Sequence, residues 1–130
     1  MTEFNKISAD NKLIERSKNG KDKLVFWLHT EIKTPPFSEN ARLTAGYFIR
    51  KLQQHQTLTM PDLRVMPSIG ERCCELRIPD GDKTWRIICR IDENAILILS
   101  IFPKKTRTTP KKEIDLARSR LKIYEKALKG

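Results

Sequence analysis

The chain has 130 residues, a length typical of one domain that buries roughly two-thirds of its unfolded surface. Charged residues make up 32% of it, and 26 Lys and Arg against 16 Asp and Glu give a net charge of +10. Even the longest apolar runs, such as Ala95–Leu99, are too short to span a bilayer, and the N-terminal residues lack the apolar core of a secretion signal. We therefore expect a cytoplasmic protein with a polyanionic partner, and neither a membrane protein nor a secreted disulfide scaffold.

Cysteine and histidine offer no spacing suited to a metal. Cys73, Cys74 and Cys89 form no C-x-x-C motif, and the two histidines are distant from them in sequence. A catalytic Cys–His pair is an alternative, but core-filling thiols explain the pattern better. The sequence predicts no metal and no cofactor.

The N-terminal residues 1–22 are polar and show no sustained apolar period. We expect a flexible arm there, followed by a folded domain over residues 23–130. The run Leu24–Leu28 predicts a first buried strand, with a short helix as the alternative.

A helix is predicted after the break at Pro35-Pro36. Ser38 is a suitable N-cap, and the helix should end near His55. Its apolar stripe consists of Ala41, Ala45, Phe48, Ile49 and Leu52. Polar residues, including Arg50 and Gln53, are expected on the outer side.

The second half changes from a helical to a strand pattern. Residues 56–70 contain Pro61, Pro67 and Gly70 and predict an irregular connection. Three apolar segments then predict an antiparallel meander over Cys73–Ile78, Thr84–Ile91 and Ala95–Phe102. Within the last of these, Ile96–Leu99 is apolar on both faces and should be the most buried.

A last helix is predicted from Thr109 as N-cap and Pro110 at the first helical position. Its apolar stripe, which should dock on the sheet or on a partner, is Ile114, Ala117, Leu121, Tyr124 and Leu128. The element order β-α-β-β-β-α indicates the α+β class.

Positive charge is concentrated near the C-terminus. From Pro103 to Gly130, ten Lys or Arg stand against three acidic residues, so this segment carries +7 of the +10. A solubilising helix face is one interpretation, and neutralisation of neighbouring phosphates is the other. The loop Lys104–Arg107 favours the second, because it leaves the most buried strand directly.

Alternation along the strands predicts a second cationic group. Residues two apart share a face, so Arg86 and Arg90 project together, as do Glu75 and Arg77. If the strands are neighbours, one face of the sheet carries Arg77, Arg86 and Arg90, with forked donors suited to phosphate. The alternative is an ordinary half-solvated face.

Three segments in this order resemble a known family. They are Glu75–Ile78 (ELRI), Trp85–Arg90 (WRIICR) and Phe102–Ile114 (FPKKTRTTPKKEI). They are similar to motifs of the phage-derived, HigB-like branch of the RelE/ParE toxin superfamily, and the similarity runs from about Leu24 to Tyr124.

The resemblance implies a small curved antiparallel sheet flanked by helices. It also implies the toxin half of a toxin–antitoxin pair, with a helix-turn-helix antitoxin as partner. Active members cleave mRNA on the ribosome by attack of a ribose 2′-oxygen on the adjacent phosphate. The positions that match the family's basic residues are Arg86, Lys104, Lys105 and Arg77.

The chemistry needs cations at the phosphate and groups that transfer protons. Crowding by other cations favours the neutral form of a lysine, which makes Lys104 or Lys105 a candidate for proton transfer. Glu75 is a candidate base, although an ion pair with an arginine is the commoner role. Further nucleic-acid contacts are expected from Arg90, Arg107, Lys111, Lys112, Trp85 and Phe102.

Three functions follow from these patterns. The leading hypothesis is a ribosome-dependent mRNA endoribonuclease that inhibits translation. A non-enzymatic inhibitor of DNA gyrase, like the ParE branch, and a basic nucleic-acid-binding module without toxicity are the alternatives. A small-molecule enzyme is disfavoured, because the sequence has no Gly-rich phosphate loop and no nucleophile motif.

Overall fold

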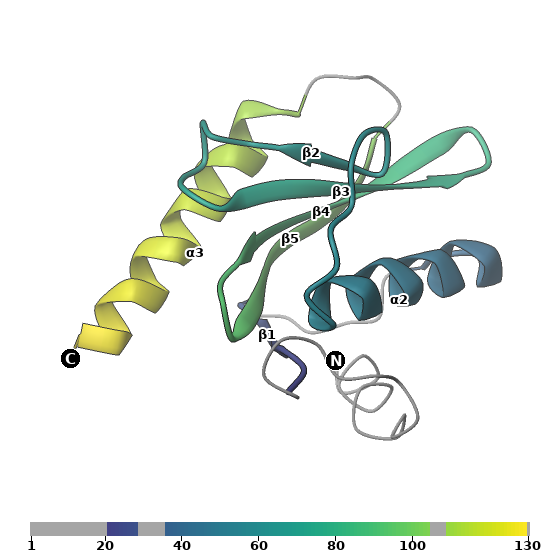
Figure 1. The fold of residues 1–130 in the computed structure, drawn as a ribbon. Helices are drawn as coiled ribbons and strands as arrows, with labels where there is room; N and C mark the ends of the chain where they lie inside the picture. Colours follow the sequence, from purple (N-terminus) through teal and green to yellow (C-terminus); the bar gives the residue numbers. More distant parts are fainter. Residues whose placement is uncertain (1–20, 29–35, 105–108, 130) are drawn as a thin grey trace.

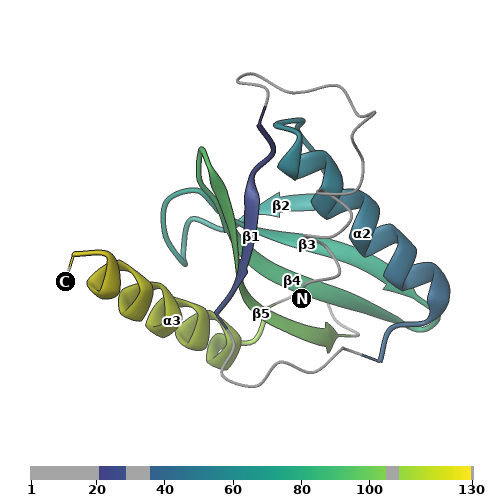
Figure 2. The same ribbon diagram turned by 90° about the horizontal axis from the view of Figure 1, so that it is seen from below.

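The computed structural model describes residues 21–28, 36–104 and 109–129. These form β1 (Leu24–Trp27), α2 (Glu39–Gln53), β2 (Leu63–Val65), β3 (Cys73–Asp80), β4 (Lys83–Ile91), β5 (Ala95–Lys104) and α3 (Lys111–Lys129). The strands make one sheet in the order β1-β5-β4-β3-β2, with α2 on one face and α3 on the other (Figure 1, Figure 2). The expected α+β fold, a small sheet flanked by helices, is confirmed.

The sheet is mixed rather than fully antiparallel. β3, β4 and β5 form the expected meander, whereas β1 pairs in parallel with β5, so that Val25 lies opposite Ile96. β1 is an edge strand in which Val25 is buried, while Leu24 and Phe26 are 58% and 41% exposed. The prediction of a buried first strand is therefore correct for the strand and wrong for its burial, because a short apolar run does not reveal its partner.

The short strand β2 corrects the expectation of an irregular connection over residues 56–70. It runs antiparallel to β3, with Arg64 opposite Glu75. Val65, which ends β2, is 70% exposed. The strand has three residues between Pro61 and Pro67, too few to show the alternation of apolar and polar residues that predicts a strand. The strand matters because it places Arg64 at the edge of the sheet beside β3.

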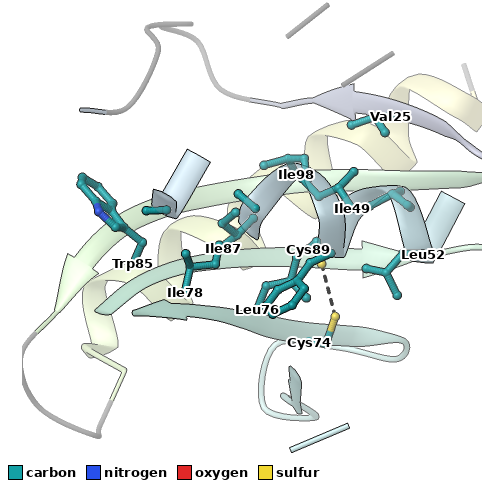
Figure 3. Close-up of a cluster of buried hydrophobic side chains, with 14 residues drawn as sticks. Val25, Ile49, Leu52, Cys74, Leu76, Ile78, Trp85, Ile87, Cys89 and Ile98 are labelled. Carbon is teal, nitrogen blue, oxygen red and sulfur yellow. Dashed lines mark hydrogen bonds between the residues drawn. The ribbon is translucent and has the colours of Figure 1, made fainter. Parts of the chain in front are cut away.

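Helix α2 buries its predicted stripe against one face of the sheet. The Ser38 hydroxyl accepts a 3.1 Å hydrogen bond from the backbone N–H of Ala41, as an N-cap should. Figure 3 shows the resulting core, in which Ile49 and Leu52 of the helix lie over Leu76 and Ile98 of the sheet. This layer holds α2 on the face opposite to α3.

Two polar residues of α2 lie inside rather than outside, which contradicts the sequence-based expectation. Arg50 is 7% exposed and forms a 2.9 Å ion pair with Asp22. Gln53 is 1% exposed, and its side-chain amide donates to the carbonyl of Lys23 at 2.9 Å. Asp22, which was assigned to the arm, is thus part of the packed structure.

The three cysteines fill the core, as expected. All are buried free thiols, and the sulfur atoms of Cys74 and Cys89 lie 3.2 Å apart across β3 and β4 (Figure 3). Burial raises the pKa of the Cys73 thiol to about 11. The Cys73 thiol is therefore protonated near neutral pH and is a poor nucleophile.

Helix α3 covers the second face with the predicted stripe. Ala117 and Leu121 are buried there, Ile114 and Tyr124 are half-buried, and Leu128 is 67% exposed. The stripe thus docks on the sheet over most of its length. The helix begins at Lys111, so the expected cap at Thr109 and first turn at Pro110 are placed too early.

Candidate nucleic-acid interface

The face of the sheet beneath α3 brings together charged residues from neighbouring strands. Arg77 of β3 lies opposite Arg86 of β4, and Arg86 in turn lies opposite Phe102 of β5. Because residues two apart share a face, Glu75 and Lys104 lie on this same side. The register therefore joins Arg77 and Arg86, as the alternation predicted.

Glu75 is the centre of this group. Its carboxylate is fully buried, lies 3.3 Å from Nη1 of Arg86 and 3.7 Å from Nε of Arg77, and accepts a 2.6 Å hydrogen bond from the Thr109 hydroxyl. A carboxylate enclosed in this way is not open to a substrate proton. The geometry is that of an ion pair, the alternative role considered for Glu75.

The two arginines differ in their access to solvent. Arg86 is 1% exposed, whereas the Arg77 side chain is 22% exposed. Arg86 therefore lies behind Glu75 and does not reach a phosphate in this arrangement. Arg77 is the member of the group that a ligand can contact directly.

An open cleft of about 760 Å³ lies above Arg77. One wall comes from β2 and the segment that follows it, and the other from the chain around the start of α3. The lining residues are Met60, Arg64, Val65, Met66, Pro67, Ser68, Arg77, Thr109 and Ile114. Two guanidinium groups on the wall of one cleft suit a ligand with phosphate oxygens.

Arg64 was not recognised from the sequence. It is exposed, and it reaches the cleft only because β2 pairs with β3. Its sequence neighbours gave no strand signal, so only the pairing of β2 reveals it.

The structure describes the predicted basic loop only at Lys104. Lys105 and Arg107 lie outside the described residues. Lys104 ends β5, is half-buried and pairs in register with Thr84, two residues beyond the Arg86 position. Of the predicted basic loop, the described part therefore consists of Lys104, on the same face of the sheet as Arg86.

Arg90 lies at the far end of β4 and serves another contact. It is 6% exposed and pairs with Glu125 of α3 at 2.8 Å and with Asp92 at 3.1 Å, and its guanidinium lies 5.8 Å from the Tyr124 ring centre. Burial lowers its pKa, but the two carboxylates outweigh burial and the pKa is raised. Four residues of strand, about 13 Å, separate it from Arg86.

The aromatic candidates are buried. Trp85 is 3% exposed on the α2 side, where its indole N–H donates to Asp80 at 2.8 Å and its ring packs edge-on against Phe37. Phe102 is 7% exposed in the core under α3. Neither ring is available in this arrangement to stack on a base, so both fill the core.

The start of α3 carries two further predicted cations. Lys111 and Lys112 are both exposed, and Lys111 pairs with Asp115 at 2.8 Å. An exposed pair of this kind contributes little to stability and leaves the lysine available to a ligand.

A bulge in β5 fixes α3 next to the cleft. Ile88 pairs with Ser100, but Cys89 pairs with Ile98, so Leu99 is an extra residue. The Ser100 hydroxyl donates to Glu113 at 2.8 Å, and the Arg120 guanidinium donates to the carbonyl of Leu99. These contacts tie the first half of the helix to the strand, and burial lowers the pKa of Arg120.

The described residues contain neither a metal-binding cluster nor a membrane-spanning helix. No cluster of His, Cys, Asp or Glu in the described ranges has the arrangement needed to hold a metal ion. Neither helix is long and apolar enough to cross a bilayer over the part of the chain that the structure covers.

Comparison with known proteins gave one match. No curated protein and no solved structure matched the chain. Residues 35–122 match the family described as "Phage derived protein Gp49-like (DUF891)", and this range includes the cleft, the Glu75 group and most of α3. The chain therefore belongs to the phage-derived Gp49-like family.

Proposed function

We propose that this protein is the toxin of a type II toxin–antitoxin pair and that it cleaves mRNA on the ribosome. The observation that carries the proposal is the open cleft with Arg64 and Arg77 on its wall, backed by the buried Glu75–Arg86 pair. Membership of a phage-derived family is compatible with a toxin. The +10 net charge suits a polyanionic substrate.

The reaction is an internal transesterification. The ribose 2′-oxygen attacks the adjacent phosphorus, the bond to the 5′-oxygen breaks, and the products are a 2′,3′-cyclic phosphate and a 5′-hydroxyl. Negative charge grows on the phosphate oxygens in the transition state, and a cation fixed beside them lowers the barrier. We assign this role to Arg77, which Glu75 orients by an ion pair, while Arg86 pairs with the same Glu75 carboxylate.

Proton transfer is assigned to the basic segment after β5. Lys104 lies at the rim of the group, and Lys105 follows it in sequence. A lysine here can take the proton of the 2′-hydroxyl in its neutral form or donate one to the leaving oxygen in its charged form. No metal is needed for either step.

The partner that silences the toxin is a cognate helix-turn-helix antitoxin in the cytoplasm. An acidic segment of such a protein complements the cationic cleft, so one surface serves both inhibition and catalysis.

The test compares three proteins in a purified translation system with a defined mRNA. Wild type should cut the mRNA and leave 2′,3′-cyclic phosphate ends, and Arg77→Gln should cut it at least about a hundredfold more slowly. Arg42→Gln is the matched control, because Arg42 is on α2 across the sheet. Intact mRNA with wild-type protein under active translation contradicts the proposal, and blocked DNA supercoiling in a parallel assay indicates gyrase instead.

A further inference from the structure

A separate hollow lies beside α3, closer to the C-terminal end of the helix than Ile114 of the cleft. This second hollow, of about 300 Å³, is lined by Ile69, Gly70, Glu71, Arg72, Arg90, Arg118, Leu121, Lys122 and Glu125. The loop from Met66 to Arg72 lies beside helix α3 (Figure 1). Residues of this loop and of α3 contribute to the lining of both hollows. The loop touches the helix there, since a Cβ on Gly70 would lie 3.5 Å from Leu121 Cδ1. The two hollows therefore lie along one line of contact between the 66–72 loop and α3, which we call the seam.

Some of the charges on this seam are already matched. Arg90 pairs with Glu125 and Asp92, and Arg72 pairs with Asp92 at 3.0 Å and with Glu71 at 3.6 Å. These ion pairs join β4, the loop and α3, and so fix the walls of the second hollow. Arg72 also has a backbone φ of +61°, an uncommon conformation for a non-glycine residue.

Two cations on the seam are unmatched. Arg118 and Lys122 are exposed, and no carboxylate among the described residues forms an ion pair with either. They are four residues apart, so they lie on the same side of the helix, about 6 Å apart along its axis. As far as the described residues go, the second hollow therefore presents two positive charges that have no ion-pair partner to an incoming anion.

The spacing suits a nucleic-acid strand. Ile114, on the wall of the first cleft, and Lys122 are eight residues apart, about 12 Å of helix. That length accommodates about three or four nucleotides at ~3.4 Å each along a helical strand. A strand whose reacting phosphate lies at Arg77 thus passes the unmatched cations a few nucleotides away.

We propose that the seam between the 66–72 loop and α3 binds the backbone of single-stranded RNA, with Arg118 and Lys122 contacting phosphates a few nucleotides from the one at Arg77. This inference rests on the proposed function and extends it to a second binding site. Arg118 and Lys122 add affinity and orient the strand, and they take no part in bond breaking.

The test measures binding without cleavage. The ligand is fluorescein-labelled single-stranded RNA, in which 2′-O-methyl groups block the nucleophilic 2′-oxygen. It is used at two lengths, about a dozen nucleotides and about three. The variant is Arg118→Gln/Lys122→Gln. The control is Arg42→Gln/Lys51→Gln, which removes one arginine and one lysine from α2 on the other face of the sheet.

The long RNA should bind the seam variant at least about tenfold more weakly than wild type or control. The slope of log K against log salt should fall in magnitude by about 1.4, at ~0.7 for each lost phosphate contact on a single strand. The short RNA, which fills only the first cleft, should bind all three proteins equally.

Other outcomes overturn the inference in distinguishable ways. If the seam variant binds the long RNA like the control while Arg77→Gln weakens it, the seam is not the path and the proposed function stands. If the seam variant binds both RNA lengths more weakly than the control does, and by the same factor, the lost affinity reflects general charge and not a binding path along the seam. If wild type binds neither RNA and leaves mRNA intact during translation, the proposed function fails and the seam with it.

Discussion

The hydroxyl of Thr109 donates a 2.6 Å hydrogen bond to Oε2 of Glu75, a residue 34 positions earlier on β3. The bond closes the buried group at the point where the chain returns to start α3. The same carboxylate lies 3.3 Å from Arg86. The Glu75 side chain therefore links Arg86 of β4 to Thr109, which lies just before the first residue of α3.

Thr109→Val should lower the free energy of unfolding by about 1–3 kcal/mol, because the valine keeps the shape and removes a hydrogen bond to a buried charged carboxylate. Thr109→Ser keeps the hydroxyl and should lose less. Urea unfolding of the two variants measures the difference. Equal stability of Val and Ser would show that the hydrogen bond contributes nothing.

Glu75→Gln should be more severe, at roughly 3–5 kcal/mol, because it removes the negative charge that lies 3.3 Å from the buried Arg86 guanidinium. Glu71→Gln is the matched control, since Glu71 is exposed and its contact with Arg72 is long. Chemical denaturation of both variants tests the contrast. A Glu75→Gln variant as stable as the control would mean that the pair contributes no stability.

Arg64→Gln should weaken substrate binding more than chemistry. Arg64 lies opposite Glu75 in the strand pairing, but its side chain is exposed on the cleft wall and forms no ion pair with Glu75 in the described structure. Its loss should therefore raise KM several-fold and change kcat little. Initial rates of RNA cleavage at varied substrate concentration separate the two constants. A fall in kcat at constant KM would place Arg64 at the reacting phosphate instead.

Stability should fall at alkaline pH because of Cys73. Its pKa is raised in the folded state from 9.0 to about 11, so the folded protein retains a proton that the unfolded chain loses. The contribution is complete below pH 9 and disappears as pH rises toward 11, at most about 3 kcal/mol in total. Urea unfolding at pH 7.5 and pH 10 should show a smaller alkaline loss in Cys73→Ala than in wild type. An equal loss in both would assign the effect to other groups, such as Cys89, whose pKa is also raised by its contact with Cys74 and by burial.

Asp22→Asn should destabilise the fold by roughly 3 kcal/mol, because it removes the carboxylate charge from the buried ion pair that Asp22 forms with Arg50. Glu93→Gln, on an exposed turn, is the control. Thermal unfolding of the two proteins gives the comparison. If Asp22→Asn unfolds at the same temperature as the control, the ion pair contributes no stability and residue 22 belongs to the flexible arm that the sequence predicted.

Regular periodicity made part of the fold predictable. The apolar stripe of α2 and the three-strand meander were correct, because helical spacing and turn residues are local signals. Alternation also placed Glu75, Arg77 and Arg86 on one face. It equally implies that Trp85, the neighbour of Arg86, points the other way, into the core under α2.

The remaining features depend on contacts distant in sequence. Arg50 and Gln53 follow a polar pattern, and only their partners Asp22 and Lys23 explain their burial. Arg64 joins the cleft through a three-residue strand whose partner supplies the pairing. The burial of Arg86 likewise depends on α3 covering the sheet, which no pattern within β4 encodes.

The extra residue in β5 decides which side of the sheet receives the basic end of that strand. Before Leu99, odd-numbered side chains face α3, and from Ser100 onward even-numbered ones do, so Phe102 and Lys104 lie on the cleft side. The alternation of β5 side chains between the two faces of the sheet therefore shifts by one residue, at Leu99. Loss or gain of one residue there would turn the basic end toward α2, whereas a change of two residues would preserve its direction.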